Sequence, residues 1–337
     1  MPGDRLQWAY SVARIRALES HMIDKNIISR MLDAGDVIEA AKVLQETEWA
    51  PYVSSLANPD ERDQSFTGEL ARIYQMVEDM IPDDWPVNIL RARYDYHNLK
   101  VALKASLASR DPVPSALSQL GNVPAQTMLD SVRNNALTDL SEDLREAAES
   151  GRSAFAQTGR FGAVDAVVDS RMFHSLISRV PEPDGEFLAG YISRYADVVN
   201  IRALARARDM HLPVDAFASF LVPGGYIDKG KFLAAYTGPE EGMADVFQNT
   251  DYAKIPSITL KPQHGEARGI WRFERDSDDF LIEYLKGSKY VAFGPEPVIG
   301  YLLGKEHEVK LIRMLLVGKA NGLPREAIRE RLRDTYV

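Results

Sequence analysis

Apolar residues recur at three- and four-residue spacing along most of this chain, which is the period of an α-helix rather than of a strand. Lys305–Lys319 shows this spacing most fully, with Val309, Ile312 and Leu316 recurring in register and further apolar residues beside them. A helix that is apolar around most of its circumference is buried inside its domain. Asn321-Gly322 predicts the end of this helix. We therefore expect the C-terminal part of the chain to form the core of a domain.

The same spacing predicts helices along the rest of the chain, separated by short loops that contain proline, glycine or aspartate. The expected helices cover residues 6–30, 37–48, 66–80, 87–108, 123–132, 136–155, 161–180, 186–209, 213–220 and 294–304, with a last one opening at 324. Strand signals are scarce. The candidates are Ile255–Leu260, which Pro256 interrupts, and a few residues around Tyr290. Helices of this length with short connections predict an all-α protein.

Three of the expected helices share a pattern, in which an acid is followed by an apolar residue four positions later and a basic residue five positions later. The members are Asp95, Leu99 and Lys100, then Asp197, Ile201 and Arg202, then Glu308, Ile312 and Arg313. A basic residue precedes each acid by three or four positions and can pair with it: Arg91, Arg194 and Lys305. The copies lie roughly 100 residues apart, too far for the common solenoid repeats. The pattern predicts three similar helical domains, 1–116, 117–219 and 220–337, with chance similarity of leucine-rich helices as the alternative.

Composition narrows the function classes. The chain has 337 residues, a formal net charge of −9 and no cysteine. An acidic body argues against non-specific binding of nucleic acid, which needs a basic field. The lack of cysteine excludes a disulfide framework, a zinc-thiolate site, an iron–sulfur cluster and a cysteine nucleophile. No apolar run approaches the ~20 residues that cross a bilayer, and the N-terminus lacks the pattern of a secretory signal. We expect a soluble, intracellular protein.

The search for catalytic motifs yields little. Gly225–Lys231 has the spacing of a phosphate-binding loop but continues with Phe232, so it lacks the hydroxyl that would hold Mg²⁺. We interpret it as a turn. The six histidines are scattered singly, without metal-ligand spacing. We therefore expect no catalytic residue, no cofactor and no metal site.

Aspartate clusters support the alternative from another class. Asp83-Asp84 and the set Asp276, Asp278 and Asp279 could hold Mg²⁺ against a diphosphate in an all-α metal-dependent enzyme. Neither cluster places acids four residues apart on one helical face, so caps and solvated loops explain them more simply. A generic helical scaffold is a third interpretation.

Several segments resemble the C subunit of V/A-type ATPases and ATP synthases, a relative of the d subunit of the eukaryotic V-ATPase. The segments that carry the resemblance are Ala13–Glu19, Asp95–Lys104, Asn200-Ile201-Arg202, Gly294-Pro295-Glu296-Pro297, Tyr301–Leu303, Lys305–Lys310, Ile312–Lys319 and Gly322-Leu323-Pro324. They span the whole chain. Leu311 stands where the family pattern leads us to expect asparagine. That departure affects packing or a cap rather than the assignment.

The resemblance implies an all-α, funnel-shaped molecule of three domains in pseudo-threefold arrangement. Such a protein belongs to the central stalk and sits on the cytoplasmic face of the proteolipid rotor ring, without inserting into the membrane. Its hollow receives the lower end of the central shaft, which the D and F subunits form. It passes torque between the ATP-handling head and the ring, which transports protons or sodium ions, and it catalyses nothing itself.

The resemblance also directs attention to the basic residue of each repeated pattern. If the three equivalent helices line the hollow, their basic side chains are candidates to meet the shaft or the ring: Lys100, Arg202 and Arg313. The simpler alternative is that these side chains brace neighbouring helices through the acids Asp95, Asp197 and Glu308.

Overall fold

The computed structural model describes residues 5–239, 242, 244–253, 255 and 270–337. These residues form α-helices and short 3₁₀-helices, and no strand occurs among them. The all-α prediction is therefore confirmed. The strand expected around Tyr290 is wrong, because this residue ends a 3₁₀-helix, Gly287–Tyr290. Apart from Ile255, the other strand candidate, Ile255–Leu260, lies outside the described residues.

The chain divides into two compact units. Unit 1 combines Met1–Pro86 with Gly269–Val337, so it brings both ends of the chain together, and unit 2 is Val87–Arg268. These two compact units do not coincide with the three domains that the sequence pattern predicts. The three domains 1–116, 117–219 and 220–337 remain a prediction.

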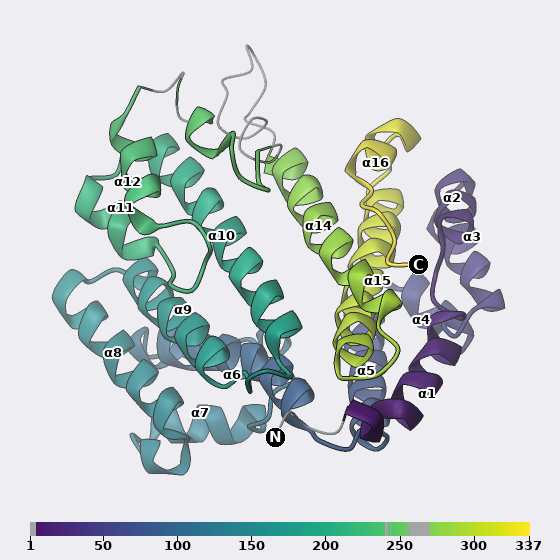
Figure 1. Cartoon of the computed structure of the whole chain (residues 1–337), viewed down its shortest axis with the longest axis horizontal. Helices are drawn as coiled ribbons and strands as arrows, with labels where there is room; N and C mark the ends of the chain where they lie inside the picture. The colour runs from purple at the N-terminus through teal and green to yellow at the C-terminus, as the bar shows by residue number, and fades with distance from the viewer. Residues whose placement is uncertain (1–4, 240–241, 243, 254, 256–269) are drawn as a thin grey trace. The chain divides into compact units, whose positions relative to one another are not determined.

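Unit 1 is organised around one long helix, α15 (Glu296–Ala320), whose side chains are mostly buried. The other α-helices of this unit are α1 (Ala9–Glu19), α2 (Lys25–Asp33), α3 (Val37–Val43), α4 (Val53–Ala57), α5 (Pro59–Glu78), α14 (Ile270–Lys286) and α16 (Arg325–Arg331). Helix α15 contacts α1, α2, α3, α5, α14 and α16 (Figure 1). The expected buried helix is thus the core of its unit, because its apolar residues surround the whole circumference.

The sequence predicts a helix ending near Gly304 and another beginning at Lys305, but α15 is continuous through this point. Close packing explains why glycine stands inside the helix. A Cβ on Gly300 would lie 2.1 Å from Ser288 Oγ, and one on Gly304 would lie 2.8 Å from the ring of Tyr336. Glycine here permits close approach of the C-terminal segment rather than ending the helix.

Unit 2 contains two long helices, α6 (Trp85–Leu107, which enters the unit from unit 1) and α10 (Glu186–Asp209). The remaining α-helices are α7 (Ala125–Arg133), α8 (Glu142–Thr158), α9 (Phe161–Ser178), α11 (Val214–Phe220) and α12 (Lys229–Thr237). Helices α8 and α9 form a hairpin that turns at Gly159, where φ is +66° (Figure 1). Helix α10 packs against α9, α11 and α12 and begins and ends as predicted.

Several other boundaries move. The helix expected over residues 37–48 ends as an α-helix at Val43 and continues as a 3₁₀ turn, Leu44–Glu46. The helix expected over residues 6–30 is interrupted at residues 20–24, where Asp24 accepts the amide of Ile27 and caps α2. The helix expected from Phe66 starts earlier, because Pro59 provides its first turn. The helix expected from Ala136 starts only at Glu142, after a 3₁₀ turn.

Candidate functional site

Helix α6 holds the loop that leads into α7. The buried carboxylate of Asp95 accepts the backbone N–H of Val123 at 2.9 Å. One turn later, Asn98 exchanges two hydrogen bonds with the backbone of Ser118, each 2.8 Å long. A Cβ on Gly121 would lie 2.3 Å from Asp95 Oδ1, so glycine is needed for the loop to come this close.

Helix α10 holds the loop before α12 in the same way. Asp197 accepts the N–H groups of Tyr226 at 2.8 Å and Ile227 at 3.2 Å. Asn200 exchanges hydrogen bonds of 3.0 and 2.8 Å with the backbone of Val222. Here a Cβ on Gly225 would lie 2.1 Å from Asp197 Oδ1. We call such a contact, in which the acid of a long helix accepts a backbone N–H from the loop before a shorter helix, a clamp.

Helix α15 makes the clamp of unit 1. Glu308 accepts the N–H of Ile23, just before α2, at 2.8 Å, and the indole N–H of Trp49 at 2.8 Å. The ammonium group of Lys305 donates to Glu308 at 2.8 Å and to Glu48 at 3.3 Å. Leu311 occupies the position of the asparagine found in α6 and α10, and a leucine side chain cannot make the second, amide-mediated exchange.

Burial sets the electrostatics of the clamps. It raises the pKa of both Asp95 and Asp197, although the hydrogen bonds to their carboxylates lower it in part. Burial by itself would lower the pKa of Lys305. The nearby carboxylates of Glu308 and Glu48 raise it by more, so the net pKa of Lys305 is raised. The local pair Lys305–Glu308 was predicted from the sequence and is confirmed.

Lys100 and Arg313, two of the basic residues proposed for the interface, pair with acids on other helices. Lys100 binds Asp169 of α9 at 2.6 Å. Arg313 binds Asp63 of α5 at 3.0 Å and lies over the ring of Phe66. Arg202 is half-buried on α10. Lys100 and Arg313 thus brace neighbouring helices, but through acids that the sequence pattern does not contain.

The aspartates of the metal-dependent alternative hold the C-terminal segment. Asp278 pairs with Lys310 and with Arg333, and Asp279 accepts the N–H of Asp334 at 2.7 Å. Burial raises the pKa of Asp279 to about 6. Within the ranges the structure describes, no three His, Asp or Glu side chains are grouped to hold a metal ion. The Gly225–Lys231 segment comprises the turn before α12 and the first three residues of that helix, which Asp228 caps.

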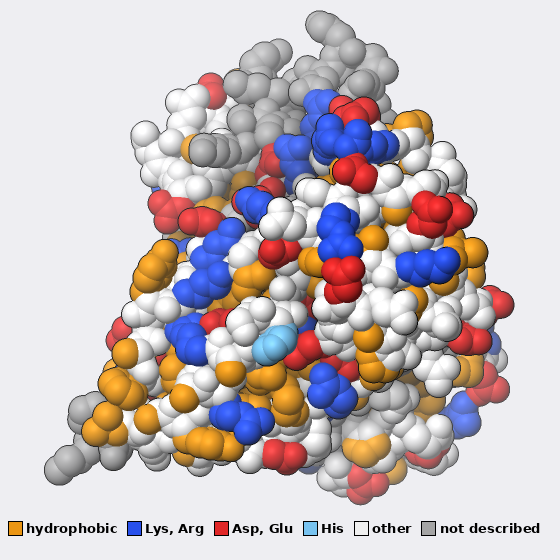
Figure 2. Space-filling view, turned by 90° about the vertical axis from the view of Figure 1, so that its right-hand side faces the viewer, with side chains coloured by type: hydrophobic (Ala, Val, Ile, Leu, Met, Phe, Trp, Pro, Cys, Tyr) orange, Lys and Arg blue, Asp and Glu red, His pale blue; other side chains and the backbone are white. Residues whose placement is uncertain are grey.

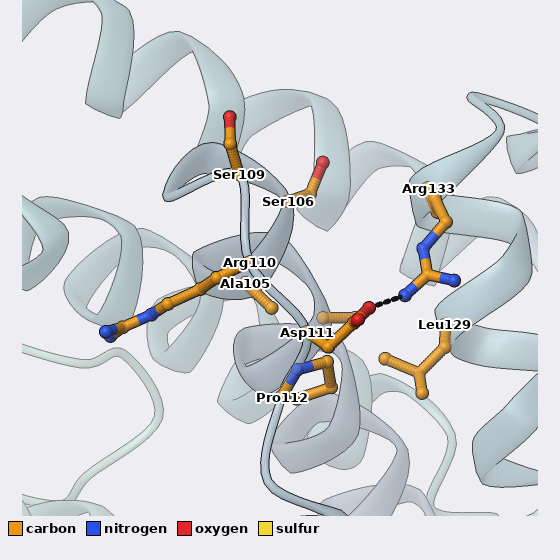
Figure 3. A pocket seen from close by; sticks show the side chains of 9 residues that line it. Ala105, Ser106, Ser109, Arg110, Asp111, Pro112, Leu129 and Arg133 are labelled. Atoms are coloured by element: carbon orange, nitrogen blue, oxygen red, sulfur yellow. Dashed lines mark hydrogen bonds and ion pairs between the residues drawn. The ribbon is translucent and has the colours of Figure 1, made fainter.

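One pocket, of about 240 Å³, lies at the C-terminal end of α6 (Figure 3). Asp111 and Arg133 form an ion pair there, and Arg110 extends away from both. The two opposite charges of Asp111 and Arg133 therefore satisfy each other.

Charges of both signs are mixed on the surface. On the face shown in Figure 2, Lys and Arg side chains are interspersed with Asp and Glu side chains, and hydrophobic side chains reach the surface in small groups. Among the described helices, none combines the length and the apolar character that crossing a membrane requires.

Comparison with known proteins gives a consistent match. A family model described as "ATP synthase (C/AC39) subunit" matches residues 11–331. The C subunit of the V-type sodium ATPase of Enterococcus hirae is 25% identical over 96% of this chain and 97% of its own length. The C subunit of the A-type ATP synthase of Methanocaldococcus jannaschii is 25% identical, over 98% of this chain and 87% of its own. Its counterpart in the V-type ATP synthase of Deinococcus radiodurans is 24% identical, over 98% and 91%.

Proposed function

Because the chain belongs to the ATP synthase (C/AC39) subunit family, we propose that it is a non-catalytic central-stalk component of a rotary V/A-type ATPase or ATP synthase. In this role it is a socket on the cytoplasmic face of the membrane. It couples the D and F shaft subunits to the proteolipid rotor ring, and so serves transport of protons or sodium ions. The observation that carries the proposal is the match of one family over residues 11–331 of an all-helical chain.

The clamps support the further proposal that the chain consists of three similar domains. Two long helices each use an aspartate and an asparagine, three positions apart, to hold a loop that lies farther along the chain. The third long helix uses Glu308, and its clamped loop comes from the start of the chain. Three related domains would show this pattern if the helix of the third domain held a loop of the first. A pseudo-threefold funnel is the arrangement we propose for them.

A protein that couples a shaft to a ring must transmit torque without yielding, and the clamps suit that task. Each clamp contains a buried carboxylate that accepts backbone N–H groups of a loop. Loops are otherwise the more flexible parts of a helical protein. Buried hydrogen-bonded networks of this kind rigidify the elements that they join. We propose that each clamp keeps its long helix and the loop that it holds moving together under load.

The function is tested by binding. The purified chain, mixed with the D and F shaft subunits, should co-elute with them in size-exclusion chromatography, and should be retained by detergent-solubilised rotor ring. It should not turn over ATP by itself. If the chain bound neither the shaft nor the ring under conditions where the remaining stalk assembles, the proposed coupling role would be ruled out.

The interface residues need a separate test, and Arg313 offers the cleanest one. We propose that Lys100, Arg202 and Arg313 face the shaft or the ring. The Arg313 side chain is 46% exposed and its partner Asp63 is 78% exposed, so their pair contributes only ~0–1 kcal/mol to stability. Arg313→Glu should therefore fold. It should weaken shaft binding by about tenfold, because an unfavourable charge at an interface costs from ~1 to several kcal/mol.

The matched control is Arg329→Glu on α16, which reverses a comparably exposed arginine that pairs with Glu326. Its shaft affinity, measured by calorimetry beside that of Arg313→Glu, should equal that of the unmodified chain. Equal affinities for all three proteins would exclude Arg313 from the interface.

A further inference from the structure

Exposed hydrophobic side chains concentrate at one place in unit 1. Of the twelve large hydrophobic side chains that are exposed among the described residues, four come from two short segments, residues 6–10 and 290–293. Leu6 and Tyr10 are 63% and 62% exposed, Tyr290 is 91% exposed and Phe293 is 44% exposed. Single exposed hydrophobic residues are ordinary, whereas a group of them beside polar residues marks an interaction site.

Hydrogen bonds hold the two segments side by side. Arg5 donates to the backbone carbonyl of Phe293 at 2.8 and 3.1 Å. Arg16, farther along α1, donates to the carbonyls of Ser288 at 2.8 Å and Val291 at 3.0 Å. The beginning of α1 and the turn between α14 and α15 lie at the same end of unit 1 (Figure 1). We call the surface formed by the four exposed side chains the aromatic end.

The aromatic end is positively charged, although the chain has a net charge of −9. Residues 5–18 and 284–295 contain five basic residues and no acidic residue. Three of the five pair with acids that flank these segments: Arg5 with Glu296, Arg16 with Glu19, and Lys286 with Glu283. The other two, Arg14 and Lys289, have no ion pair with a carboxylate of the described residues. Arg14 is exposed and follows Tyr10 by four positions, so both lie on one face of α1.

This combination of side chains fits the surface of an acidic membrane. Tyrosine and phenylalanine rings are favoured at the level of lipid headgroups, and lysine and arginine are attracted to acidic lipids. Nucleic acid is a poorer match, because the negative charge of the whole chain repels it. The choice of a lipid layer over an acidic protein rests on the proposed role at the membrane face.

We propose that the aromatic end lies on acidic phospholipid headgroups. Tyr10, Tyr290 and Phe293 reach between the headgroups, and Arg14 and Lys289 face their phosphates. This peripheral contact adds a lipid partner to the protein partners of the coupling role.

The test is co-sedimentation of the full-length chain with vesicles. Two compositions are compared: equal parts of phosphatidylglycerol and phosphatidylcholine, and phosphatidylcholine alone. We expect the chain to sediment with the acidic vesicles and to stay in solution with the neutral ones. High salt should weaken the binding, because salt screens the attraction between exposed charges. The vesicles contain no ring protein, so the outcome is distinguishable from success or failure of ring binding.

Charge variants identify the surface. Arg14→Gln should weaken binding to acidic vesicles by about fivefold, the usual effect of losing one cation near such a membrane, and Arg14→Glu by more than about tenfold. Both should melt like the unmodified chain, because Arg14 is exposed and has no ion pair to lose. Arg110→Glu is the matched control. This arginine is also exposed and without an ion pair, but it lies in unit 2, so its reversal should leave binding unchanged.

A further variant tests the aromatic contribution. Tyr290→Ala should weaken binding to acidic vesicles at low and at high salt, because the contact of an apolar ring with the membrane is not screened. Met210→Ala is the control, since Met210 is another exposed hydrophobic residue, 68% exposed, in unit 2. It should bind vesicles like the unmodified chain.

A fluorescent label shows which surface touches the lipid. The chain has no cysteine, so a single introduced cysteine can be labelled with nitrobenzoxadiazole, whose emission moves to the blue in apolar surroundings. Ala13→Cys places the label on the exposed face of α1, between Tyr10 and Arg14. Ala156→Cys places it on an exposed position of α8, in unit 2, as the control. With acidic vesicles, emission from position 13 should move to the blue and emission from position 156 should not.

Several results would overturn the proposal. One is that acidic vesicles do not bind the chain, or that neutral vesicles bind it equally well. Another is that Arg14→Glu binds like Arg110→Glu, or that the labels at positions 13 and 156 respond alike, since either would mean general adsorption. Binding of a soluble hexaglutamate peptide that depends on Arg14, without binding to vesicles, would identify an acidic protein as the partner instead.

Discussion

Replacing Glu308 by glutamine is expected to lower the free energy of unfolding of unit 1 by about 3–5 kcal/mol, which is the usual result of removing one partner from a buried ion pair. The side chains of Lys305 and Glu308 are only 1% and 3% exposed. Without the carboxylate of Glu308, the buried ammonium retains Glu48 as an acidic partner, which lies farther away at 3.3 Å. Glutamine has one acceptor oxygen where glutamate has two. It therefore accepts the hydrogen bonds from Ile23, Trp49 and Lys305 less well.

The tryptophans make this change easy to follow. All four lie in unit 1, at Trp8, Trp49, Trp85 and Trp271, so denaturant unfolding watched by tryptophan fluorescence reports this unit. Glu326→Gln, at an exposed pair on α16, is the matched control and should change the free energy by less than ~0.5 kcal/mol.

A double variant tests the reason for the loss. Lys305→Met combined with Glu308→Gln leaves no buried ammonium to compensate, and should recover at least half of the lost stability, since buried ion pairs are often replaced by neutral groups at little cost. A loss below ~1 kcal/mol for Glu308→Gln alone would show that the clamp of α15 contributes little.

The second large effect is expected in unit 2. Asp197→Ala should cost about 2–4 kcal/mol, because it removes the acceptor of two backbone N–H groups in a buried position, and each unpaired buried group costs ~1–3 kcal/mol. The loop before α12 loses its attachment to α10. Amide hydrogen exchange over Lys229–Thr237 should therefore become faster, while tryptophan fluorescence changes little.

The control is Asp139→Ala, at an exposed aspartate of the same unit, and far-UV circular dichroism compares the two variants. Asp139→Ala should unfold like the unmodified chain. If α12 exchanged at the same rate in Asp197→Ala and in the unmodified chain, the hydrogen bonds from Tyr226 and Ile227 would not be what holds the loop.

Most of the long helices were predictable because local signals define them, whereas α4, α12 and α14 were not expected from the sequence. Helix α10 begins after the Pro183-Asp184-Gly185 turn and ends where predicted, since proline and glycine punctuate the chain there. Helix α15 was harder. Glycine has a low helix propensity, so Gly304 suggested a break, whereas packing against Tyr336 requires glycine inside the helix. Tertiary contact overrode local preference at that point.

The candidate site was predictable only in part. The repeated pattern located Asp95, Asp197 and Glu308 as members of one set. The pattern paired these acids with nearby basic residues, because an acid and a base three or four positions apart on a helix are neighbours. It missed that their principal partners are backbone N–H groups, whose availability depends on how a loop returns to the helix.

The sequence by itself determined the helical class and the positions of the three acids, because these depend on periodicity and local spacing, and its resemblance to known sequences indicated the family. Only the tertiary structure decided what the acids hold. Glu308 accepts the amide of Ile23, 285 positions earlier in the chain, and Arg313 reaches Asp63 rather than an acid of its own helix. Contacts between the two ends of a chain cannot be seen in the local periodicity of the sequence at either end, because only the folded core brings these residues together.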